Sequence, residues 1–193
     1  MPRTAVKAKA LFFEVKGKGT RILAAQAQGS LLKLHGPLGS GFPVLTGRSI
    51  LAAGGIGIAP LVFLAASTGM PRTLIYGART AGRLACPPED LKLPGLTLVE
   101  ATDDGSRGEQ GTVAELLASR LEGVDAVFAC GPHAMLKQVA ALAAQKGIEA
   151  WLSMEEKMAC GVGACRGCAV SAADGYRFVC SDGPVFRAGE VNL

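Results

Sequence analysis

Aromatic and charged side chains are scarce in this chain, and both shortages limit what it can bind. Aromatic residues make up 5% of the 193 residues, and Lys, Arg, Asp and Glu together make up 19%. The formal net charge of +4 is only mildly basic, and the Lys and Arg residues between positions 7 and 21 are typical of a solvated strand face. A nucleic-acid surface needs a denser basic patch, so we expect no nucleic-acid partner.

Histidine is also rare, which argues against acid–base catalysis by this chain. Its two histidines, His35 and His133, are too far apart in the sequence to suggest a catalytic pair. We find no Ser-His-Asp arrangement and no paired carboxylates, and Asp103-Asp104 before Gly105 is typical of a turn. We therefore expect no catalytic residue of this kind in the chain.

A secretory signal is absent from the start of the sequence, where Met1 leads into alternating residues and not into an apolar block. Residues 49–71 carry no charge and could by length cross a bilayer. However, Gly54, Gly55 and Pro60 divide this stretch into two short apolar runs, which is typical of a strand, a turn and a helix. We expect no membrane span and a cytoplasmic location.

Cysteine residues, in contrast, are clustered in this chain. Four of the six cysteines lie close together in the sequence with a definite spacing. Three are arranged as C-x4-C-x2-C, and a fourth follows after eleven further residues. The four are Cys160, Cys165, Cys168 and Cys180. This is the plant-type spacing of a [2Fe–2S] cluster, in which each iron takes two thiolates. In a reducing compartment, clustered cysteines more often hold a metal or a cluster than form disulfides.

Glycines surround these cysteines, at Gly161, Gly163 and Gly167. Backbone N–H groups must point at the bridging sulfides of a cluster, and side chains at such positions would block them. The rival interpretation is a structural zinc site, whose usual spacing is two CxxC pairs. The four-residue first interval and the glycine-rich loop favour the cluster. Cys86 and Cys130 stand apart from this group.

The middle of the chain alternates strands and helices, which predicts an α/β fold with a doubly wound, five-stranded parallel sheet. The predicted strands are residues 49–53, 73–76, 96–101, 125–129 and 148–152. The predicted helices are residues 59–67, 112–121 and 133–146. Thr112 with Glu115 three residues later forms a capping box for the second helix.

Two strands of this sheet end in small residues where a nucleotide would need close approach. In such sheets the ligand lies beyond the carboxyl ends of the strands, where the strand order reverses. The first strand ends in GGIGIAP and the fourth in ACGP. The dinucleotide fingerprint is incomplete, because Pro60 replaces its third glycine and no acidic residue closes the second strand. Arg79, just past that second strand, could meet the adenosine end of a cofactor.

A chain with both a nicotinamide site and a [2Fe–2S] cluster needs a converter, because hydride carries two electrons and the cluster accepts one at a time. Flavin is the usual converter. The stretches LFFEVKGKGT and LLKLHGPLGSGFP read as strands of a small barrel that could hold it. We therefore divide the chain into a remnant of a FAD-binding β-barrel over 1–46, a NAD-binding domain over 47–153 and a cluster domain over 154–193.

These features together resemble one family, the electron transfer subunit of class 1B dihydroorotate dehydrogenase, within the ferredoxin-reductase superfamily. The resemblance covers essentially the whole chain. The segments that carry it are FEVKGKGT, GPLGSGF, GGIGIAPL, YGAR, TDDGS, ACGP, SMEEKMACGVGACRGCAV and CSDGPVF. The glycine turns are individually unspecific, whereas the cysteine loop followed by CSDGPVF is specific.

The resemblance implies an electron relay for pyrimidine biosynthesis, in which NADH, FAD and a [2Fe–2S] cluster exchange electrons with FMN on a separate catalytic subunit that oxidises dihydroorotate. It implies a hetero-oligomer with that subunit, and cluster ligands at the four spaced cysteines. The implied FAD contacts are Phe12, Phe13, Glu14, Gly19 and Thr20. The implied nicotinamide nucleotide contacts are Gly54, Gly55, Ile56, Gly57, Ile58, Cys130, Gly131 and Pro132.

The start of the chain departs from the family. Its members begin with several more barrel strands and an Arg-Pro-x-Ser-type motif that grips the flavin, whereas this chain begins with MPRT near that point. We therefore expect FAD to bind weakly, or only with help from a partner.

Three questions stay open at the level of sequence. The electron acceptor could belong to another NAD(P)H-dependent flavin and iron–sulfur reductase, linked to ferredoxin or to sulfur. A non-catalytic zinc-binding protein is an alternative of a different class. The choice between NADH and NADPH is also open, because Arg79 and Arg83 could accept a 2′-phosphate.

Overall fold

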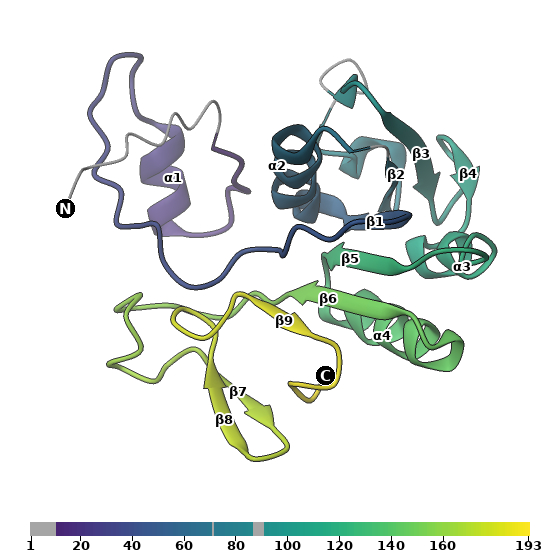
Figure 1. Cartoon of the computed structure of the whole chain (residues 1–193). Helices are drawn as coiled ribbons and strands as arrows, with labels where there is room; N and C mark the ends of the chain where they lie inside the picture. Colours follow the sequence, from purple (N-terminus) through teal and green to yellow (C-terminus); the bar gives the residue numbers. More distant parts are fainter. Residues whose placement is uncertain (1–10, 71, 87–90) are drawn as a thin grey trace. The chain divides into compact units, whose positions relative to one another are not determined.

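The computed structural model describes residues 11–70, 72–86 and 91–193 and divides the chain into two compact units, Met1–Leu34 and His35–Leu193 (Figure 1). The described part of the first unit holds one helix, α1 (Lys18–Ala24), which has no buried residue. Thr20 lies in its first turn, and its hydroxyl accepts the backbone N–H groups of Lys16 (3.0 Å) and Gly17 (3.1 Å).

The barrel strands predicted for residues 11–20 and 31–43 are wrong. Within the described residues 11–48, the only β-pairing outside the main sheet is an isolated bridge between Ser40 and Pro184. A strand is stabilised by hydrogen bonds to a neighbouring strand, and no described segment provides one for residues 11–34. The Thr20 hydroxyl instead satisfies amides at the start of α1, which favours a helix where a strand was predicted.

The second unit is built on a sheet that contains all five predicted strands in parallel. These are β1 (Ser49–Gly54), β2 (Arg72–Ala78), β3 (Leu96–Thr102), β5 (Ala126–Cys130) and β6 (Glu149–Ser153). The prediction of five strands falls short, because the described sheet has two more, in the order β4-β3-β2-β1-β5-β6-β9. The two-residue β4 (Glu109–Gln110) pairs in parallel with β3, and β9 (Val185–Arg187) pairs antiparallel with β6.

Three helices cover this sheet, and each was predicted from the sequence. They are α2 (Ile58–Thr68), α3 (Val113–Ala118) and α4 (His133–Lys146). A 3₁₀ turn, η1 (Gly55–Gly57), joins β1 to α2, and a second, η2 (Ala81–Arg83), follows β2. The predicted capping box of α3 is present, since the Glu115 carboxylate accepts the Thr112 N–H at 2.7 Å. The helix is shorter than predicted because it ends at Ala118.

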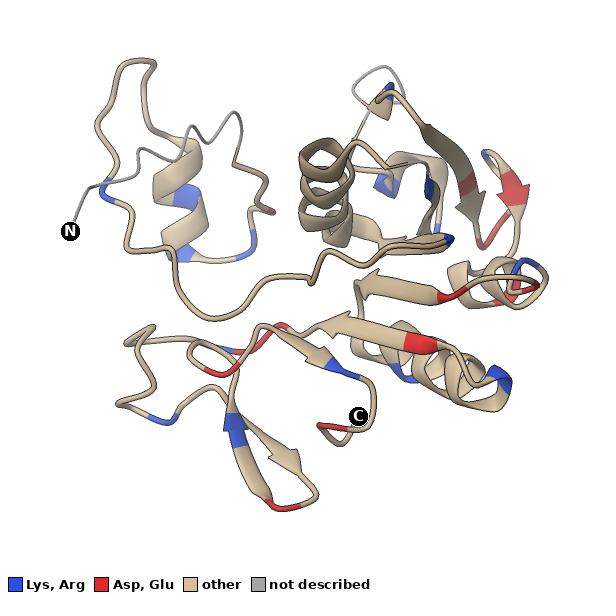
Figure 2. Cartoon of the chain, in the orientation of Figure 1, with Lys and Arg blue, Asp and Glu red and all other residues tan. Residues whose placement is uncertain are grey.

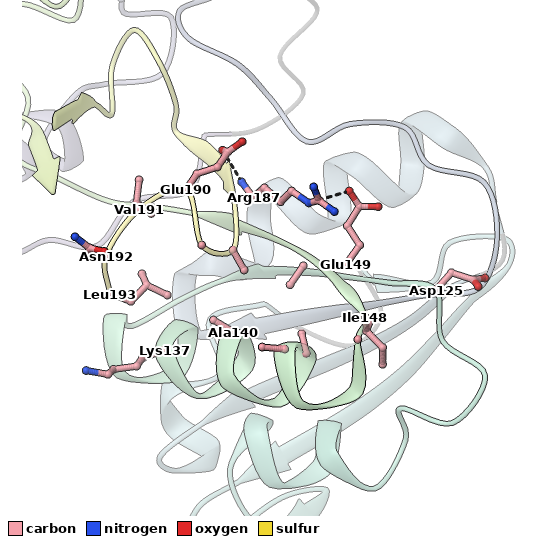
Figure 3. A pocket seen from close by; sticks show the side chains of 16 residues that line it. Asp125, Lys137, Ala140, Ile148, Glu149, Arg187, Glu190, Val191, Asn192 and Leu193 are labelled. Atoms are coloured by element: carbon pink, nitrogen blue, oxygen red, sulfur yellow. Dashed lines mark hydrogen bonds and ion pairs between the residues drawn. The ribbon is translucent and has the colours of Figure 1, made fainter. Parts of the chain in front are cut away.

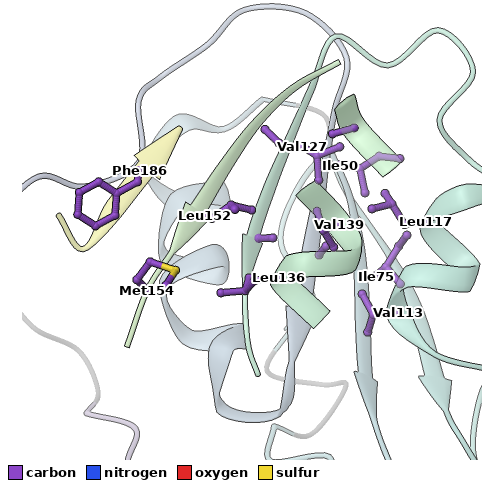
Figure 4. Close-up of a cluster of buried hydrophobic side chains, with 14 of the residues drawn as sticks. Ile50, Ile75, Val113, Leu117, Val127, Leu136, Val139, Leu152, Met154 and Phe186 are labelled. Atoms are coloured by element: carbon purple, nitrogen blue, oxygen red, sulfur yellow. The ribbon is translucent and has the colours of Figure 1, made fainter. Parts of the chain in front are cut away.

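The sheet is buried on both faces, as expected for parallel strands. On one face, Ile50, Ile75, Val127 and Leu152 pack with Leu117 of α3 and with Leu136 and Val139 of α4 (Figure 4). On the other face, Leu51, Leu74, Tyr76 and Phe128 pack with α2. Each fully buried Leu, Ile or Val side chain contributes about 1.5–3 kcal/mol, so these two layers hold β1 and β5 rigidly in the centre of the sheet.

The segment that carries the clustered cysteines is tied to the sheet. It contains the hairpin β7 (Ala169–Ala172) and β8 (Gly175–Phe178), and then β9, which completes the edge of the sheet beside β6. Cys168, Val179 and Cys180 are buried in the same hydrophobic core as the side chains between α4 and the sheet. The cysteine segment therefore shares a hydrophobic core with the strands.

Lys and Arg residues are interspersed with Asp and Glu residues over the described elements (Figure 2). In the described part of the chain, no helix is both long enough and apolar enough to cross a membrane. The uncharged stretch around residue 60 is β1, η1 and α2, as its glycine and proline positions predicted.

Candidate cofactor sites

The carboxyl ends of β1 and β5 lie side by side in the centre of the sheet. Ala53 of β1 is in register with Cys130 of β5, and the order of the strands reverses at this pair. A Cβ atom on Gly54 would lie 2.6 Å from the Pro132 Cδ, and one on Gly131 would lie 2.9 Å from the Gly54 N. The structure thus brings the predicted nucleotide residues 54–58 and 130–132 together, and only glycine permits the close approach.

Gly55 has a different role from its neighbours. Its φ is +53°, in the left-handed region, and a Cβ atom there would meet nothing within 4 Å. The glycine therefore opens a space at the start of η1, directly before the N-terminus of α2. Free backbone amides and the helix dipole at such a place favour an anionic group such as a pyrophosphate.

Cys130 places a buried thiol at the same point. Burial raises its pKa to about 11, the Ser153 hydroxyl beside it acts in the opposite direction, and the Glu155 carboxylate adds to the rise. Ser153 is the register partner of Cys130 on β6. The thiol is thus protonated at neutral pH and cannot act as a thiolate nucleophile there.

The TDDGS segment closes the carboxyl ends of β2 and β3. The N–H groups of Asp103 and Asp104 donate to the carbonyls of Ala78 (3.1 Å) and Arg79 (3.3 Å). The Asp104 carboxylate accepts from the Ser106 hydroxyl at 2.6 Å and from its N–H at 3.0 Å, which lowers the pKa of Asp104. The predicted turn is confirmed.

Sequence reasoning missed the second part of this turn. The Ser106 hydroxyl accepts the N–H of Ala81 at 2.8 Å and so ties the turn to the start of η2. A serine two residues after an aspartate is the signal that could have indicated it.

The four spaced cysteines come together as two pairs. The Sγ atoms of Cys168 and Cys180 are 3.3 Å apart. The Sγ of Cys160 accepts the N–H of Cys165 at 3.3 Å, and the thiol of Cys165 also interacts with it. The Gly163 N–H donates to the Sγ of Cys180 at 3.1 Å and so links the two pairs.

The environments of the two pairs differ electrostatically. Donation from the backbone of Cys165, and next from that of Val162, lowers the pKa of Cys160 to about 6. Interaction with the Cys168 thiol, followed by burial, raises the pKa of Cys180. Cys168 and Cys180 are buried, whereas Cys165 is exposed. One pair therefore lies at the surface and the other in the core.

The donor set fits a two-iron cluster better than a single ion. A structural zinc needs four ligands around one point, whereas a [2Fe–2S] cluster needs two thiolates at each iron. Gly161 (φ +71°) and Gly163 (φ +76°) are left-handed, and the N–H groups of Val162, Gly163 and Cys165 donate to cysteine Sγ atoms.

The predicted FAD residues lie in the first unit. Phe12 and Phe13 are about 40% exposed, with values of 40% and 37%. Glu14 forms an ion pair with Lys16 at 2.8 Å, and Thr20 is occupied with the amides before α1. No contact among the described residues brings these five together around a common point.

A cleft of about 950 Å³ lies elsewhere in the second unit, between α4 and the segment after β9 (Figure 3). Its floor is made by small side chains of α4, and Lys137, Glu149 and Arg187 lie at its edge. None of the predicted site residues lines it.

Comparisons with known proteins also indicate an iron–sulfur protein. Residues 155–192 match the model of a family described as the iron-sulfur cluster binding domain of dihydroorotate dehydrogenase B. The chain is 38% identical over 187 residues to the dihydroorotate dehydrogenase B (NAD(+)), electron transfer subunit, of Caldanaerobacter subterraneus, covering 94% of this chain and 74% of that protein. It is 39% identical over 193 residues to the subunit of the same name from Geobacillus kaustophilus, covering 95% and 74%.

A solved structure is similar over nearly the same range. It comes from work on flavin-based electron bifurcation by the NADH-dependent reduced ferredoxin-NADP oxidoreductase. The TM-score is 0.79 at 32% sequence identity, and the match covers 93% of this chain and 67% of that one.

Proposed function

Because the chain belongs to the family of electron transfer subunits of dihydroorotate dehydrogenase B, we propose that it relays electrons between NAD(H), FAD and a [2Fe–2S] cluster. The electrons pass to or from a catalytic subunit that contains FMN and oxidises dihydroorotate in pyrimidine biosynthesis. The chain is then an oxidoreductase subunit of a cytoplasmic hetero-oligomer, and the dihydroorotate site lies on its partner.

The arrangement of the four cysteines is the observation that carries this proposal. Cys160 and Cys165 would hold one iron, and Cys168 and Cys180 the other. The pairing follows from the contacts within each pair, and the Gly163 N–H supplies a hydrogen bond to sulfur between them. Such N–H donors tune the reduction potential of a cluster as well as holding it.

The nucleotide site is assigned to residues 54–58 and 130–132. Gly54, Gly57 and Gly131 bring two strand ends into contact, and Gly55 leaves room for the pyrophosphate before α2. The protonated thiol of Cys130 offers the nicotinamide a compact neutral neighbour that does not compete as a nucleophile.

FAD is assigned to Phe12, Phe13, Glu14, Gly19 and Thr20 on the basis of the family. When bound, a flavin exchanges two electrons with NADH and one at a time with the cluster. In this proposal residues 1–46 serve the flavin, 47–153 the nicotinamide nucleotide and 154–193 the cluster. The exposed rings of Phe12 and Phe13 are available for stacking on a flat cofactor.

A second candidate acceptor is supported by the similarity to the structure of the NADH-dependent reduced ferredoxin-NADP oxidoreductase. In that case the same three cofactors would serve a ferredoxin-linked partner. The two candidates differ only in the protein that receives the electrons. Co-purification with an FMN-containing dihydroorotate dehydrogenase subunit supports the first, and a stable complex with a ferredoxin-linked subunit in its place supports the second.

The decisive experiment is anaerobic purification of the whole chain, followed by an absorption spectrum and by iron, sulfide and flavin assays on one sample. We expect equal amounts of iron and sulfide, and bleaching of the visible bands when NADH and a flavin are supplied. Zinc without sulfide, or a protein that stays colourless after anaerobic reconstitution with iron and sulfide, would rule the proposal out.

A further inference from the structure

Arg166 has an unusual backbone conformation within the cysteine loop. Its φ is +56°, and in the described part of the chain it is the only residue other than glycine with a positive φ. The left-handed region costs a residue with a Cβ atom about 1–2 kcal/mol relative to the right-handed one. The other left-handed positions of this loop, Gly161 and Gly163, carry glycine. Arginine at position 166 therefore calls for an explanation from its side chain.

The side chain reaches the second cysteine-bearing segment. The guanidinium carbon of Arg166 lies 6.0 Å from the ring centroid of Phe178, the last residue of β8. The Phe178 N–H donates to the Asp182 carboxylate at 2.7 Å, and its carbonyl accepts the Asp182 N–H at 2.8 Å. Cys180 lies within this closed turn. Arg166 thus connects the loop of three cysteines to the turn that presents the fourth.

The charge of Arg166 is not neutralised by an ion pair with any described residue. Nearby on β8, the Arg177 guanidinium pairs with the Asp174 carboxylate at 2.9 Å, so that cation is largely compensated. Arg166 follows Cys165 directly and precedes Cys168 by two positions. Its positive charge is therefore carried by the loop between Cys165 and Cys168, which are ligands of different irons in the proposed cluster.

We propose that Arg166 raises the reduction potential of the cluster. This inference rests on the proposed function. One-electron reduction adds a negative charge to the cluster, and a cation nearby stabilises the reduced form. The side chain is exposed, so solvent and salt weaken the interaction, and we expect a modest effect.

A redox titration, in which electron paramagnetic resonance measures the reduced cluster, tests whether the positive charge of Arg166 raises the reduction potential. The wild type and the variants R166Q and R166K are purified anaerobically and compared at the potential where half of the wild-type cluster is reduced. For R166Q, we expect the ratio of reduced to oxidised cluster to fall about threefold, and R166K to stay near the wild type. High salt should reduce the difference in the ratio of reduced to oxidised cluster between the wild type and R166Q, because salt screens the charge.

Two further variants show whether a change in reduction potential comes from the charge at position 166, from backbone strain at that position, or from the net charge of the protein. R166G removes the cation but relieves the left-handed backbone, so it should retain iron and sulfide and titrate like R166Q. It also supplies the comparison if R166Q fails to assemble a cluster. K146Q removes one positive charge at the C-terminus of α4 and should titrate like the wild type.

The inference is overturned if R166Q and R166G titrate like the wild type, or if R166K shifts as far as R166Q. A wild-type protein that binds no iron and sulfide would instead refute the proposed function itself. The two failures are therefore distinguishable in one set of samples.

Discussion

The Sγ atoms of Cys168 and Cys180 lie 3.3 Å apart, because the two residues flank the β7–β8 hairpin, with Cys168 directly before β7 and Cys180 two residues after β8. The Val179 N–H donates to the Cys168 carbonyl at 3.1 Å, so the hairpin itself sets this proximity. Both thiols are buried. The pair is therefore preformed by the fold, whereas Cys160 and Cys165 lie on a glycine-rich loop.

Replacing Cys180 with alanine should abolish cluster assembly. The variant C180A removes one ligand of the buried pair, and no other described thiol lies beside Cys168 in its place. We expect iron and sulfide contents of the anaerobically reconstituted protein to fall to background. C86A is the matched control, since Cys86 is also buried but packs in the cluster on the α2 face. Wild-type iron and sulfide in C180A would contradict the assignment of this ligand.

Replacing Gly163 with alanine should make the cluster labile. Gly163 has a φ of +76°, and a Cβ atom there would lie 3.1 Å from the Oγ of Ser181, the residue after Cys180. The strain is about 1–2 kcal/mol, and it acts on the N–H donor to Cys180. We expect G163A to lose its visible absorbance in air several times faster than the wild type.

Gly189 provides the control for backbone strain alone. It has a φ of +94°, and a Cβ atom would meet nothing within 4 Å. G189A should lower the melting temperature to a similar extent but leave the rate of bleaching unchanged. Equal bleaching of both variants would show that general stability, and not the N–H donor, protects the cluster.

Much of the fold of the second unit could be predicted, because its helices and strands are marked by residues that lie close together in the sequence. Helix α4 has the predicted bounds His133–Lys146, and the Thr112–Glu115 capping box was readable from two residues. The switch between β1 and β5 followed from the order of strands and helices together with their glycine endings. The parallel core strands are nearly continuous apolar runs, which is the pattern that burial on both faces requires.

The errors and omissions fall where structure depends on distant partners. The segment 11–20 has residues suited to a strand, but strand formation requires a neighbour that the described chain does not offer. Strands β4 and β9 are two and three residues long, too short for alternation to show. Nothing in the sequence marks Arg166 as left-handed, because arginine is not a residue that favours this region.

The Cys130 thiol should ionise only at alkaline pH. Burial raises its pKa from the ordinary value of 9.0 to about 11. The protonated form is the one that the folded state favours, so its contribution to stability is fully present below pH 9.0 and is lost as the pH rises through about 11. Alkylation of Cys130 by iodoacetamide, measured by mass spectrometry, should stay slow at pH 8 and rise steeply only towards pH 11.

Two variants test the causes of this shift in opposite directions. The Ser153 hydroxyl lowers the pKa, so S153A should move the alkylation profile to higher pH. The Glu155 carboxylate raises it, so E155Q should move the profile to lower pH. A wild-type profile with its midpoint near pH 9 would show that the thiol is not buried as the structure has it.

Replacing Gly55 with alanine should weaken NADH binding without disturbing the fold more than a matched change elsewhere. Gly55 begins η1, the turn before α2, and Gly69 is the C-cap of α2, with φ values of +53° and +61°. At both positions a Cβ atom would meet nothing within 4 Å. The variants G55A and G69A therefore carry the same backbone strain, about 1–2 kcal/mol, and similar losses of melting temperature are expected.

Only at Gly55 would the added methyl group enter space assigned to the pyrophosphate. Displacing the phosphate from the amides before α2 should raise the Kd for NADH about tenfold, which corresponds to about 1.4 kcal/mol. Fluorescence titration with NADH measures this in both variants, and iron content should match the wild type. If G69A weakens binding as much as G55A, the effect comes from strain in α2. If neither variant does, the nucleotide does not lie over the turn between β1 and α2.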